Sequence, residues 1–230
     1  TRMMIKDDFD ELVKSLTKDP IPYLRKYAAL RLGDLGDKKA IEYLLAGIRD
    51  ENIEVRMASA QALGKLADES LVEKMIETLK DSNDYLREQT IQVLSSMGEL
   101  AVPPLIRSLK SHNWMLPYCA VRALGLIKDK RSIEALIELV EDDSNVYVQK
   151  AAIDALEKMG KDGEEELSAG LSHESGYVRE KIAQIMAKSG SKDCIDRLKE
   201  AIDRESDNRT KDRMTECLKK LEVRFNISTE

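Results

Sequence analysis

One unit of about 31 residues recurs seven times along the chain, and it constrains the fold more than any other feature of the sequence. Each unit opens a helical pattern with an apolar residue, usually followed by Arg, and the best copies close it with Ala-Leu-Gly. The opening residues are Leu24, Val55, Leu86, Leu116, Val148, Val178 and, weakly, Thr210. A fixed period of this length indicates a solenoid, in which each unit packs mainly against its neighbours.

Each unit contains two helical patterns of apolar residues separated by a short polar turn. In the second unit Asp37 is placed to cap the first helix, and the turn 50–52 precedes the second. The first helices are predicted at about 6–17, 38–49, 69–80, 100–110, 130–141, 163–171 and 192–203. The second helices are predicted at about 22–34, 53–65, 84–96, 116–127, 146–158, 177–188 and 209–221. We expect an all-α, right-handed α-solenoid of about seven stacked antiparallel helix pairs, because pairs this short bury their apolar faces only by stacking.

A single solenoid is expected over residues 6–223, with polar ends. Its units are predicted at about 6–36, 37–67, 68–98, 99–128, 129–160, 161–190 and 191–223. Residues 1–5 are expected to be disordered or carried over from cloning, and the sequence leaves open whether Thr1 and Arg2 are native. The tail 224–230 is expected to fray.

The stretch from Asp50 to Asp68 reads as Asp, four residues, Val-Arg, then Ala-Leu-Gly-x-Leu and a closing Asp, and 19–37 follows it closely. This pattern resembles the HEAT repeat, in the short form named after phycobilisome lyases, over about 6–222. The resemblance implies a fold rather than one function, since such repeats serve as scaffolds, lyase subunits, hydroxylases and DNA glycosylases. It also implies that the Val-Arg helices line a concave face. It further implies a structural ladder that joins Arg25, Arg56, Arg87 and Arg179 to Asp19, Asp50 and Asp81.

Residue counts argue against the enzymes of this fold. Deoxyhypusine hydroxylases resemble it but carry several His-Glu pairs for two irons, whereas this chain has two histidines and one such pair, His173-Glu174. The sequence has no Gly-x-Ser-x-Gly elbow and no Gly-rich phosphate loop, and the nearest Cys-His approach in sequence is His112 with Cys119. We therefore predict a protein that is not an enzyme and that needs no cofactor or metal.

The acidic composition limits the partners. A net charge of -6 argues against nucleic acid as a partner, because a phosphate-backbone binder shows a basic stripe. No apolar run is long enough for a bilayer, so no membrane partner is expected. The three cysteines are far apart and show no CxxC spacing, which favours reduced thiols and a cytoplasmic location. A monomer is favoured, although the sequence does not determine the oligomeric state.

Aromatic residues gather at one register of an otherwise aromatic-poor chain. The position before the apolar-Arg pair holds Tyr23, Tyr85, Tyr147 and Tyr177, and Trp114 stands beside it in the fourth unit. Tyr27 and Tyr118 fall in the first turns of their helices. Two interpretations stay open for each ring: packing on the turn between units, or anchoring of a partner, for which Tyr and Trp are well suited.

The fourth unit is irregular, because Pro117 stands where the ladder Arg belongs. This change is either a harmless kink or part of a docking pocket. We predict a protein or peptide partner on the concave face, centred on Trp114, Tyr85, Tyr118, Arg122 and Tyr147 and flanked by Tyr23, Tyr27 and Tyr177. The alternative is a bilin-lyase-like or other HEAT-like enzyme subunit, in which the same rings hold a flat ligand. A nucleic-acid-binding glycosylase is the more remote alternative.

Overall fold

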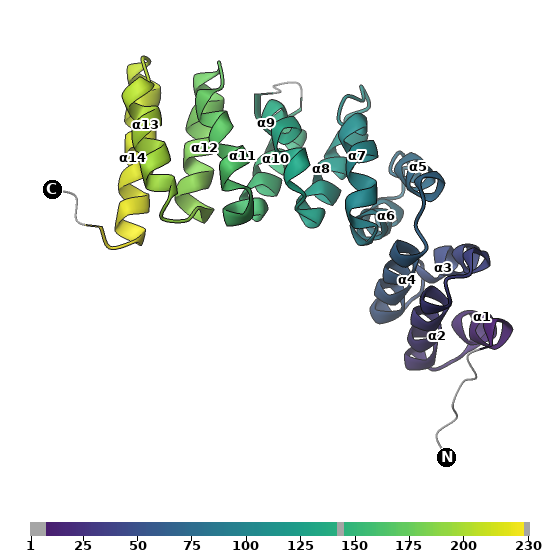
Figure 1. Ribbon diagram of the computed structural model, residues 1–230. Helices are drawn as coiled ribbons and strands as arrows, with labels where there is room; N and C mark the ends of the chain where they lie inside the picture. Colours follow the sequence, from purple (N-terminus) through teal and green to yellow (C-terminus); the bar gives the residue numbers. More distant parts are fainter. Residues whose placement is uncertain (1–7, 142–144, 228–230) are drawn as a thin grey trace. The chain divides into compact units, whose positions relative to one another are not determined.

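The computed structural model describes residues 8–141 and 145–227, and every regular element in these ranges is a helix. The chain divides into two compact units, Thr1–Ser108 (unit 1) and Leu109–Glu230 (unit 2). Both are built from pairs of helices that follow one another with short connections (Figure 1). The predicted all-α repeat of helix pairs is thereby confirmed. The division falls inside the fourth predicted repeat, so the single solenoid over 6–223 stays a prediction.

Unit 1 holds the first three repeats and the first helix of the fourth. Its helices are α1 (Phe9–Lys18), α2 (Pro22–Leu35), α3 (Ile41–Gly47), α4 (Ile53–Lys65), α5 (Glu69–Thr78), α6 (Asp84–Ser96) and α7 (Val102–Ser108). Short 3-10 turns, η1 (Lys38–Ala40) and η2 (Gly98–Ala101), precede α3 and α7. The second helices α2, α4 and α6 pack in that order, and α1 contacts α3 as α5 contacts α7.

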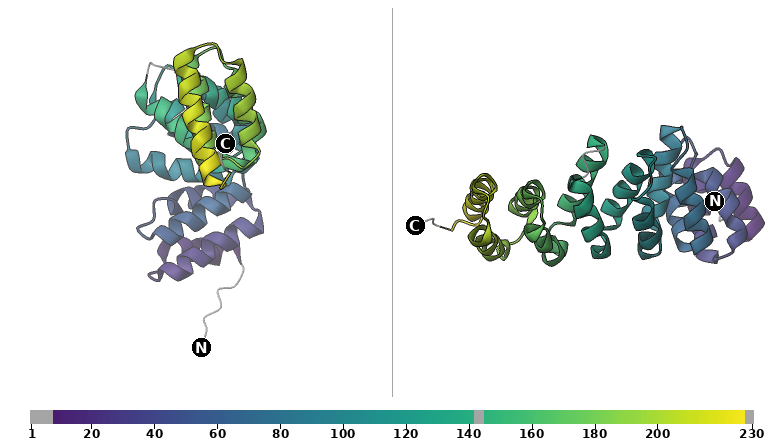
Figure 2. Two further views of the ribbon diagram at one scale, coloured as in Figure 1. Left: turned by 90° about the vertical axis from the view of Figure 1, so that its left-hand side faces the viewer. Right: turned by 90° about the horizontal axis from the view of Figure 1, so that it is seen from above.

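Unit 2 begins with a loop and the second helix of the fourth repeat. Its helices are α8 (Met115–Ile127), α9 (Ile133–Glu141), α10 (Val146–Met159), α11 (Glu164–Ala169), α12 (Gly176–Ser189), α13 (Cys194–Arg204) and α14 (Asn208–Arg224). The 3-10 turns are η3 (Lys130–Ser132), η4 (Gly160–Gly163) and η5 (Gly170–Ser172). The second helices α8, α10, α12 and α14 pack in sequence, and the first helix α9 contacts α11. Figure 2 shows the helix pairs of unit 2 following one another from teal to yellow.

The second helices lie within three residues of their predicted bounds, whereas several first helices begin in a tighter turn than predicted. The Asp37 carboxylate accepts a hydrogen bond from the Lys39 amide at 2.9 Å, and Asp129 accepts one from Arg131 at the same distance. In both cases the first turn after the cap is a 3-10 segment, which continues into the α-helix. The first helix predicted at 163–171 is the six-residue α11, flanked by η4 and η5.

The Ala-Leu-Gly signature is explained by the close packing of successive second helices. A Cβ added to Gly33 on α2 would lie 2.7 Å from the Ala62 Cβ on α4, and one on Gly125 of α8 would lie 2.9 Å from the Ala155 Cβ on α10. Glycine and alanine therefore occupy the helix–helix contacts because any larger pair would overlap. The leucines that precede these glycines, Leu32 and Leu124, are fully buried.

The last described residues make hydrogen bonds to α12 and to α14. The Arg224 guanidinium donates to the carbonyl oxygens of Ala187 at 2.9 Å and Lys188 at 2.6 Å, and the Ile227 amide donates to Glu222 at 3.0 Å. Arg224 thus satisfies unpaired carbonyl groups at the end of α12, and the frayed tail over 224–230 stays a prediction. Residues 228–230, and the predicted N-terminal segment 1–5, lie outside the described residues.

Candidate docking groove on the second helices of unit 2

The predicted ladder is most complete between the first two repeats. The Arg25 guanidinium on α2 donates to both Asp50 carboxylate oxygens at 2.8 and 2.9 Å, and to the Asp19 carbonyl at 2.9 Å. The Asp50 carboxylate also accepts the Asn52 amide at 2.8 Å. One arginine thus joins the turn before its own helix to the turn before the next second helix, which sets the register between repeats.

At the other junctions the partners differ from the prediction. Arg179 pairs with Glu205 at 2.6 and 3.0 Å and donates to the His173 carbonyl at 2.7 Å. Arg87 donates to the Asp81 carbonyl and pairs with the exposed Asp84 carboxylate. Asp19 and Asp81 therefore act in the ladder through backbone oxygens, which no side-chain pattern identifies.

Arg56 holds the turn before α4 by donating to the carbonyl oxygens of Asp50 and Glu51, both at 2.9 Å. Its Nε is enclosed and has no hydrogen-bond partner among the described residues, and its guanidinium carbon lies 5.6 Å from the centre of the Tyr85 ring. Gln149, which replaces the ladder Arg in α10, donates to the Val140 carbonyl at 2.8 Å. It therefore keeps a hydrogen bond to a backbone carbonyl group that precedes its own helix, as the ladder arginines do, but it carries no positive charge.

Both buried carboxylates of the ladder titrate below their usual range. Burial raises the pKa of Asp50, but the hydrogen bonds from Arg25 and from the Asn52 amide lower it more. The hydrogen bond from Arg179 lowers the pKa of Glu205 and outweighs the opposing effect of burial. Both groups are therefore ionised at neutral pH and bind their arginines as carboxylates.

Three of the predicted aromatic residues form one cluster in unit 2. The Trp114 ring lies just before α8, 6.1 Å between centroids from Tyr118 and 5.9 Å from Tyr147 on α10. The side chains of Trp114 and Tyr147 stay 42% and 67% exposed. Pro117, at the ladder position, is buried in the first turn of α8, a place where proline does not disturb a helix.

A groove continues from this cluster between α8 and α10. It has a volume of about 280 Å³, and Arg122 lies in it with its guanidinium carbon 5.8 Å from the Tyr118 ring centre. The groove is lined by Tyr118, Arg122, Gly125, Tyr147, Lys150, Ala151, Asp154, Ala155 and Lys158. Gly125 and Ala155, at which α8 and α10 approach each other closely, both line the groove. Because their side chains are small or absent, they leave the space of the groove unfilled. We call Trp114 and these lining residues the aromatic groove.

The other predicted site residues make different contacts within their own units. Tyr85 belongs to unit 1, on α6, where it contacts Arg56. Tyr23 and Tyr27 lie on α2, and within unit 1 neither ring has an aromatic partner among the described residues. Tyr177 begins α12 in unit 2, with Lys181 Nζ 5.3 Å from its ring centre. The structure thus brings together Trp114, Tyr118, Tyr147 and Arg122, and the concave character of the face stays a prediction.

The matching face of unit 1 has a different hollow. Its volume is about 490 Å³, and its lining includes Leu30, Met57, Gln61 and Gln92 without an aromatic ring. The charges in it are paired, since Lys26 Nζ lies 2.9 Å from a Glu54 carboxylate oxygen. This hollow is therefore electrically neutral and has no rigid anchor for a partner.

A larger hollow of unit 2, about 640 Å³, lies on the first helices, between α9 and α11. Lys130 lies 3.6 Å from Glu166 across it, and His173 Nε2 lies 3.8 Å from Glu138. Its lining contains no tyrosine or tryptophan, and its charges face one another. We regard it as less suited to a macromolecular partner than the aromatic groove, despite its larger volume.

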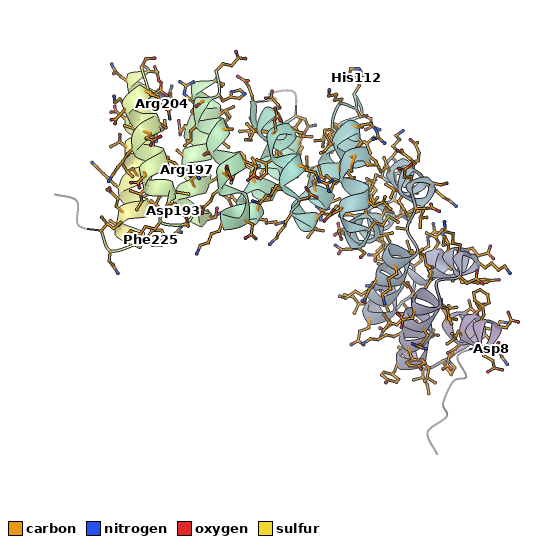
Figure 3. All side chains as sticks on the ribbon, in the orientation of Figure 1. Asp8, His112, Asp193, Arg197, Arg204 and Phe225 are labelled. Carbon is orange, nitrogen blue, oxygen red and sulfur yellow. The ribbon has the colours of Figure 1, made fainter. Side chains whose placement is uncertain are left out.

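No catalytic or metal constellation emerges elsewhere within 8–141 and 145–227. His112 lies exposed at the tip of the loop before α8 (Figure 3), whereas Cys119 is buried within that helix, so the two do not form a dyad. Burial raises the pKa of Cys194 to about 11, which makes this thiol a poor nucleophile. The described residues contain no group of three or more His, Cys, Asp or Glu side chains arranged to hold a metal ion. Over those same residues no helix is both long and apolar enough to cross a bilayer.

Sequence reasoning missed the polar half of the groove. Lys150, Asp154 and Lys158 follow Tyr147 at three, seven and eleven residues, which places all four on one side of α10. That spacing was visible in the sequence. The missing information was that the small residues Gly125 and Ala155 open a groove beside them.

The comparisons with known proteins agree with this architecture. The family model for HEAT repeats matches residues 9–95, 72–157 and 134–219, which together cover most of the chain. No curated protein matches the sequence.

Three solved structures illustrate the likeness. The complex of CpcE and CpcF of phycocyanin lyase from Nostoc sp. PCC7120 is 19% identical, with a TM-score of 0.43, over 65% of this chain and 99% of that one. Human deoxyhypusine hydroxylase in complex with glycerol is 18% identical, with a TM-score of 0.41, over 94% and 84% of the two chains. An engineered protein is 17% identical, with a TM-score of 0.33, over 94% and 97%. None of these values supports a transfer of function. The match of the family model along the chain, together with the stacked helix pairs and their arginine ladder, shows that this protein belongs to the HEAT-repeat family.

Proposed function

We propose that this protein is a non-enzymatic interaction scaffold that binds a segment of a partner protein in the aromatic groove of unit 2. The HEAT repeat is a helical scaffold whose stacked second helices present one continuous surface within a unit. The protein acts as a monomer in the cytoplasm, where the buried thiols of Cys119, Cys194 and Cys217, which form no disulfide with one another, would stay reduced.

The contact of three aromatic rings beside an open groove carries this proposal. Trp114 and Tyr147 expose large apolar surfaces, and Tyr118 is half-buried beside them, although only 4% of the chain is aromatic. Rigid rings of this kind dominate the energy of protein interfaces, since they bury much area and lose few rotamers. Ring-to-ring packing also holds the cluster in place before a partner arrives, which lowers the entropy cost of binding.

Affinity capture from the source host with wild type and Trp114→Ala tests the proposal. We expect a defined protein to bind wild type and to bind the variant about 30-fold more weakly, equivalent to about 2 kcal/mol. Circular dichroism of the variant should match wild type, because the removed ring is partly exposed. Met57→Ala, which removes an exposed apolar side chain from the unit 1 hollow, is the matched control and should retain the partner.

Equal capture by wild type, Trp114→Ala and Tyr147→Ala would overturn the choice of this groove. A product formed from a bound protein or small molecule would overturn the non-enzymatic assignment.

The alternative of a flat chromophore has less support from the geometry. The Trp114 and Tyr147 rings are tilted by 31° with centroids 5.9 Å apart, so they contact each other and leave no slot for a planar ligand between them. An absorbance titration with a bilin distinguishes the two cases. A spectral shift at micromolar protein that disappears in Trp114→Ala would favour the chromophore.

A further inference from the structure

The aromatic groove carries an excess of positive charge in an acidic protein. Two lysines line it, Lys150 and Lys158, against the single carboxylate of Asp154. The whole chain has a net charge of -6. A local excess of cations on an acidic chain creates a field that selects for an anionic partner.

The groove lysines also differ from lysines at comparable positions on other second helices. Lys65 pairs with Asp34 on the preceding second helix at 2.6 Å, and Lys188 pairs with Glu157 at 2.5 Å. Lys150 and Lys158 are exposed and have no ion pair within 8–141 and 145–227. Their charges are therefore available to a ligand. Those of Lys65 and Lys188 are already neutralised by ion pairs between repeats.

We infer that the segment bound in the aromatic groove is acidic and extended, with an aromatic or large apolar residue that packs on Trp114 and Tyr147 and carboxylates that face Lys150 and Lys158. This inference rests on the proposed function and names the chemistry of the partner. The apolar residue supplies the anchor, and the carboxylates determine orientation, because the rings and the lysines follow one another along the groove.

Distances along α10 set the spacing of the carboxylates. Lys150 and Lys158 are eight residues apart, which corresponds to about 12 Å along a helix axis. Four residues of extended chain cover about 13 Å. An extended segment with carboxylates four residues apart therefore reaches both lysines. Tyr147, which contacts the aromatic anchor, precedes Lys150 by about one turn of helix.

Asp154 favours a peptide over a nucleic acid. It lies between the two lysines on the same side of α10, so a continuous line of phosphates would place a negative charge beside it. Spaced carboxylates avoid that repulsion, because the residues between them can be neutral.

Three fluorescein-labelled peptides test the inference by fluorescence anisotropy with the full chain. The first is a phenylalanine followed by six glutamates, the second replaces the glutamates by glutamines, and the third replaces the phenylalanine by alanine. At about 20 mM salt we expect the first to bind at least tenfold more tightly than either of the others, and the difference from the glutamine peptide to shrink at about 150 mM salt. Emission of Trp114, the single tryptophan, should shift with the first peptide alone.

Charge-reversed variants show where the acidic peptide binds. The double variant Lys150→Glu/Lys158→Glu should weaken the glutamate peptide at least tenfold. Lys74→Glu/Lys219→Glu changes the net charge equally at exposed positions on α5 and α14, and it should leave binding within about twofold. Equal loss in both double variants would overturn the inference, because it would show a response to net charge rather than to the groove.

The outcomes separate this inference from the proposed function. Equal binding of the glutamate and glutamine peptides, lost in Trp114→Ala, would overturn the acidic partner and leave the aromatic docking site intact. Failure of the glutamate peptide to bind at millimolar concentration would also overturn the acidic partner, whereas capture of a native partner tests the proposed function independently. Tighter binding of a six-nucleotide oligothymidylate than of the glutamate peptide would replace the peptide by a nucleic acid.

Discussion

The two units share one helical repeat but use their exposed second-helix faces differently. In unit 1, Arg25 and Asp50 join successive turns with a buried bidentate ion pair, and the lysines of α2 and α4 are paired with carboxylates. In the first half of unit 2, Pro117 and Gln149 stand at the ladder positions, and the groove lysines are unpaired among the described residues. The ladder returns at Arg179 and Glu205.

This difference teaches that the charges of a repeat protein can serve either the stack or a partner. Where a lysine or arginine pairs with a carboxylate of a neighbouring repeat, its charge is neutralised. Where the ladder arginines are replaced, close packing keeps the register between repeats, as the contact of Gly125 with Ala155 shows. The polar groups beside that contact remain open to ligands. The predictions below test whether the two units are stabilised in this way.

Loss of a ladder arginine should have the largest effect on stability. Arg25→Ala would leave the Asp50 carboxylate buried without its partner, and Arg179→Ala would do the same to Glu205, whose side chain is 3% exposed. We expect each to lower the free energy of unfolding by about 3 kcal/mol in urea titrations.

Arg87→Ala is the control for this prediction, because the carboxylate partner of Arg87, Asp84, is 92% exposed. The expected loss is about 1 kcal/mol, mostly from the backbone hydrogen bond to Asp81. A loss as large as that of Arg25→Ala would show that burial of the carboxylate does not determine the effect.

Overpacking of the stack should have a smaller effect in both units. Ala60 on α4 and Ala123 on α8 are 5% and 0% exposed, so Ala60→Leu and Ala123→Leu force a larger side chain into filled space. We expect a loss of about 2 kcal/mol for each, measured by thermal unfolding. Gln61→Leu, at the exposed neighbour of Ala60, is expected to change stability by less than about 0.5 kcal/mol. An unchanged melting temperature in Ala123→Leu would contradict its place in the core.

Acid should weaken both units through their buried carboxylates. The folded-state pKa values of Asp50 and Glu205 lie below their ordinary values, so these groups contribute stability that is fully present above about pH 5. That contribution is lost as the pH falls through the lowered folded-state pKa values.

Asp50→Asn and Glu205→Gln should each be less stable than wild type at pH 7 and lose less stability between about pH 5 and pH 3. Urea titrations at successive pH values measure this. Variants with the same pH dependence as wild type would show that other carboxylates govern acid unfolding.

Thiol reactivity should give the smallest effect and report on unit 2 alone. All three cysteines lie in unit 2 and are buried, and burial raises the pKa of both Cys194 and Cys217. Reaction with an aromatic disulfide reagent at pH 8 should therefore require local opening. Arg179→Ala should speed the reaction more than Arg25→Ala, because only the first weakens the ladder of unit 2. Equal acceleration by both would show that the units open as one.

Much of this architecture is predicted by the sequence alone. The period and the two apolar patterns in each unit predicted the second helices to within three residues, because stacked repeats obey the same local rules in every copy. The ladder was predicted in outline, but its acceptors were not. Asp19 and Asp81 contribute carbonyl oxygens, and Glu205 replaces an aspartate, because the reach of an arginine depends on the path of the turn.

The candidate site was predicted in part. The aromatic register identified Trp114, Tyr118 and Tyr147, but it treated seven aromatic residues as one row. Only the structure shows that these three rings touch, and that the groove beside them is lined by Lys150 and Lys158. Contacts across helices depend on how closely two axes approach, and a period in the sequence does not contain that distance.

The sequence by itself determined the repeat, the positions of its helices and the family, because apolar periodicity, capping residues and small residues at fixed places act locally and in every unit. Tertiary structure decided which ladder charges are buried, where the chain divides into two units, and which aromatic residues meet. Those properties depend on side chains that are distant in sequence and pack within a few ångströms, where a change of one methyl group alters the contact.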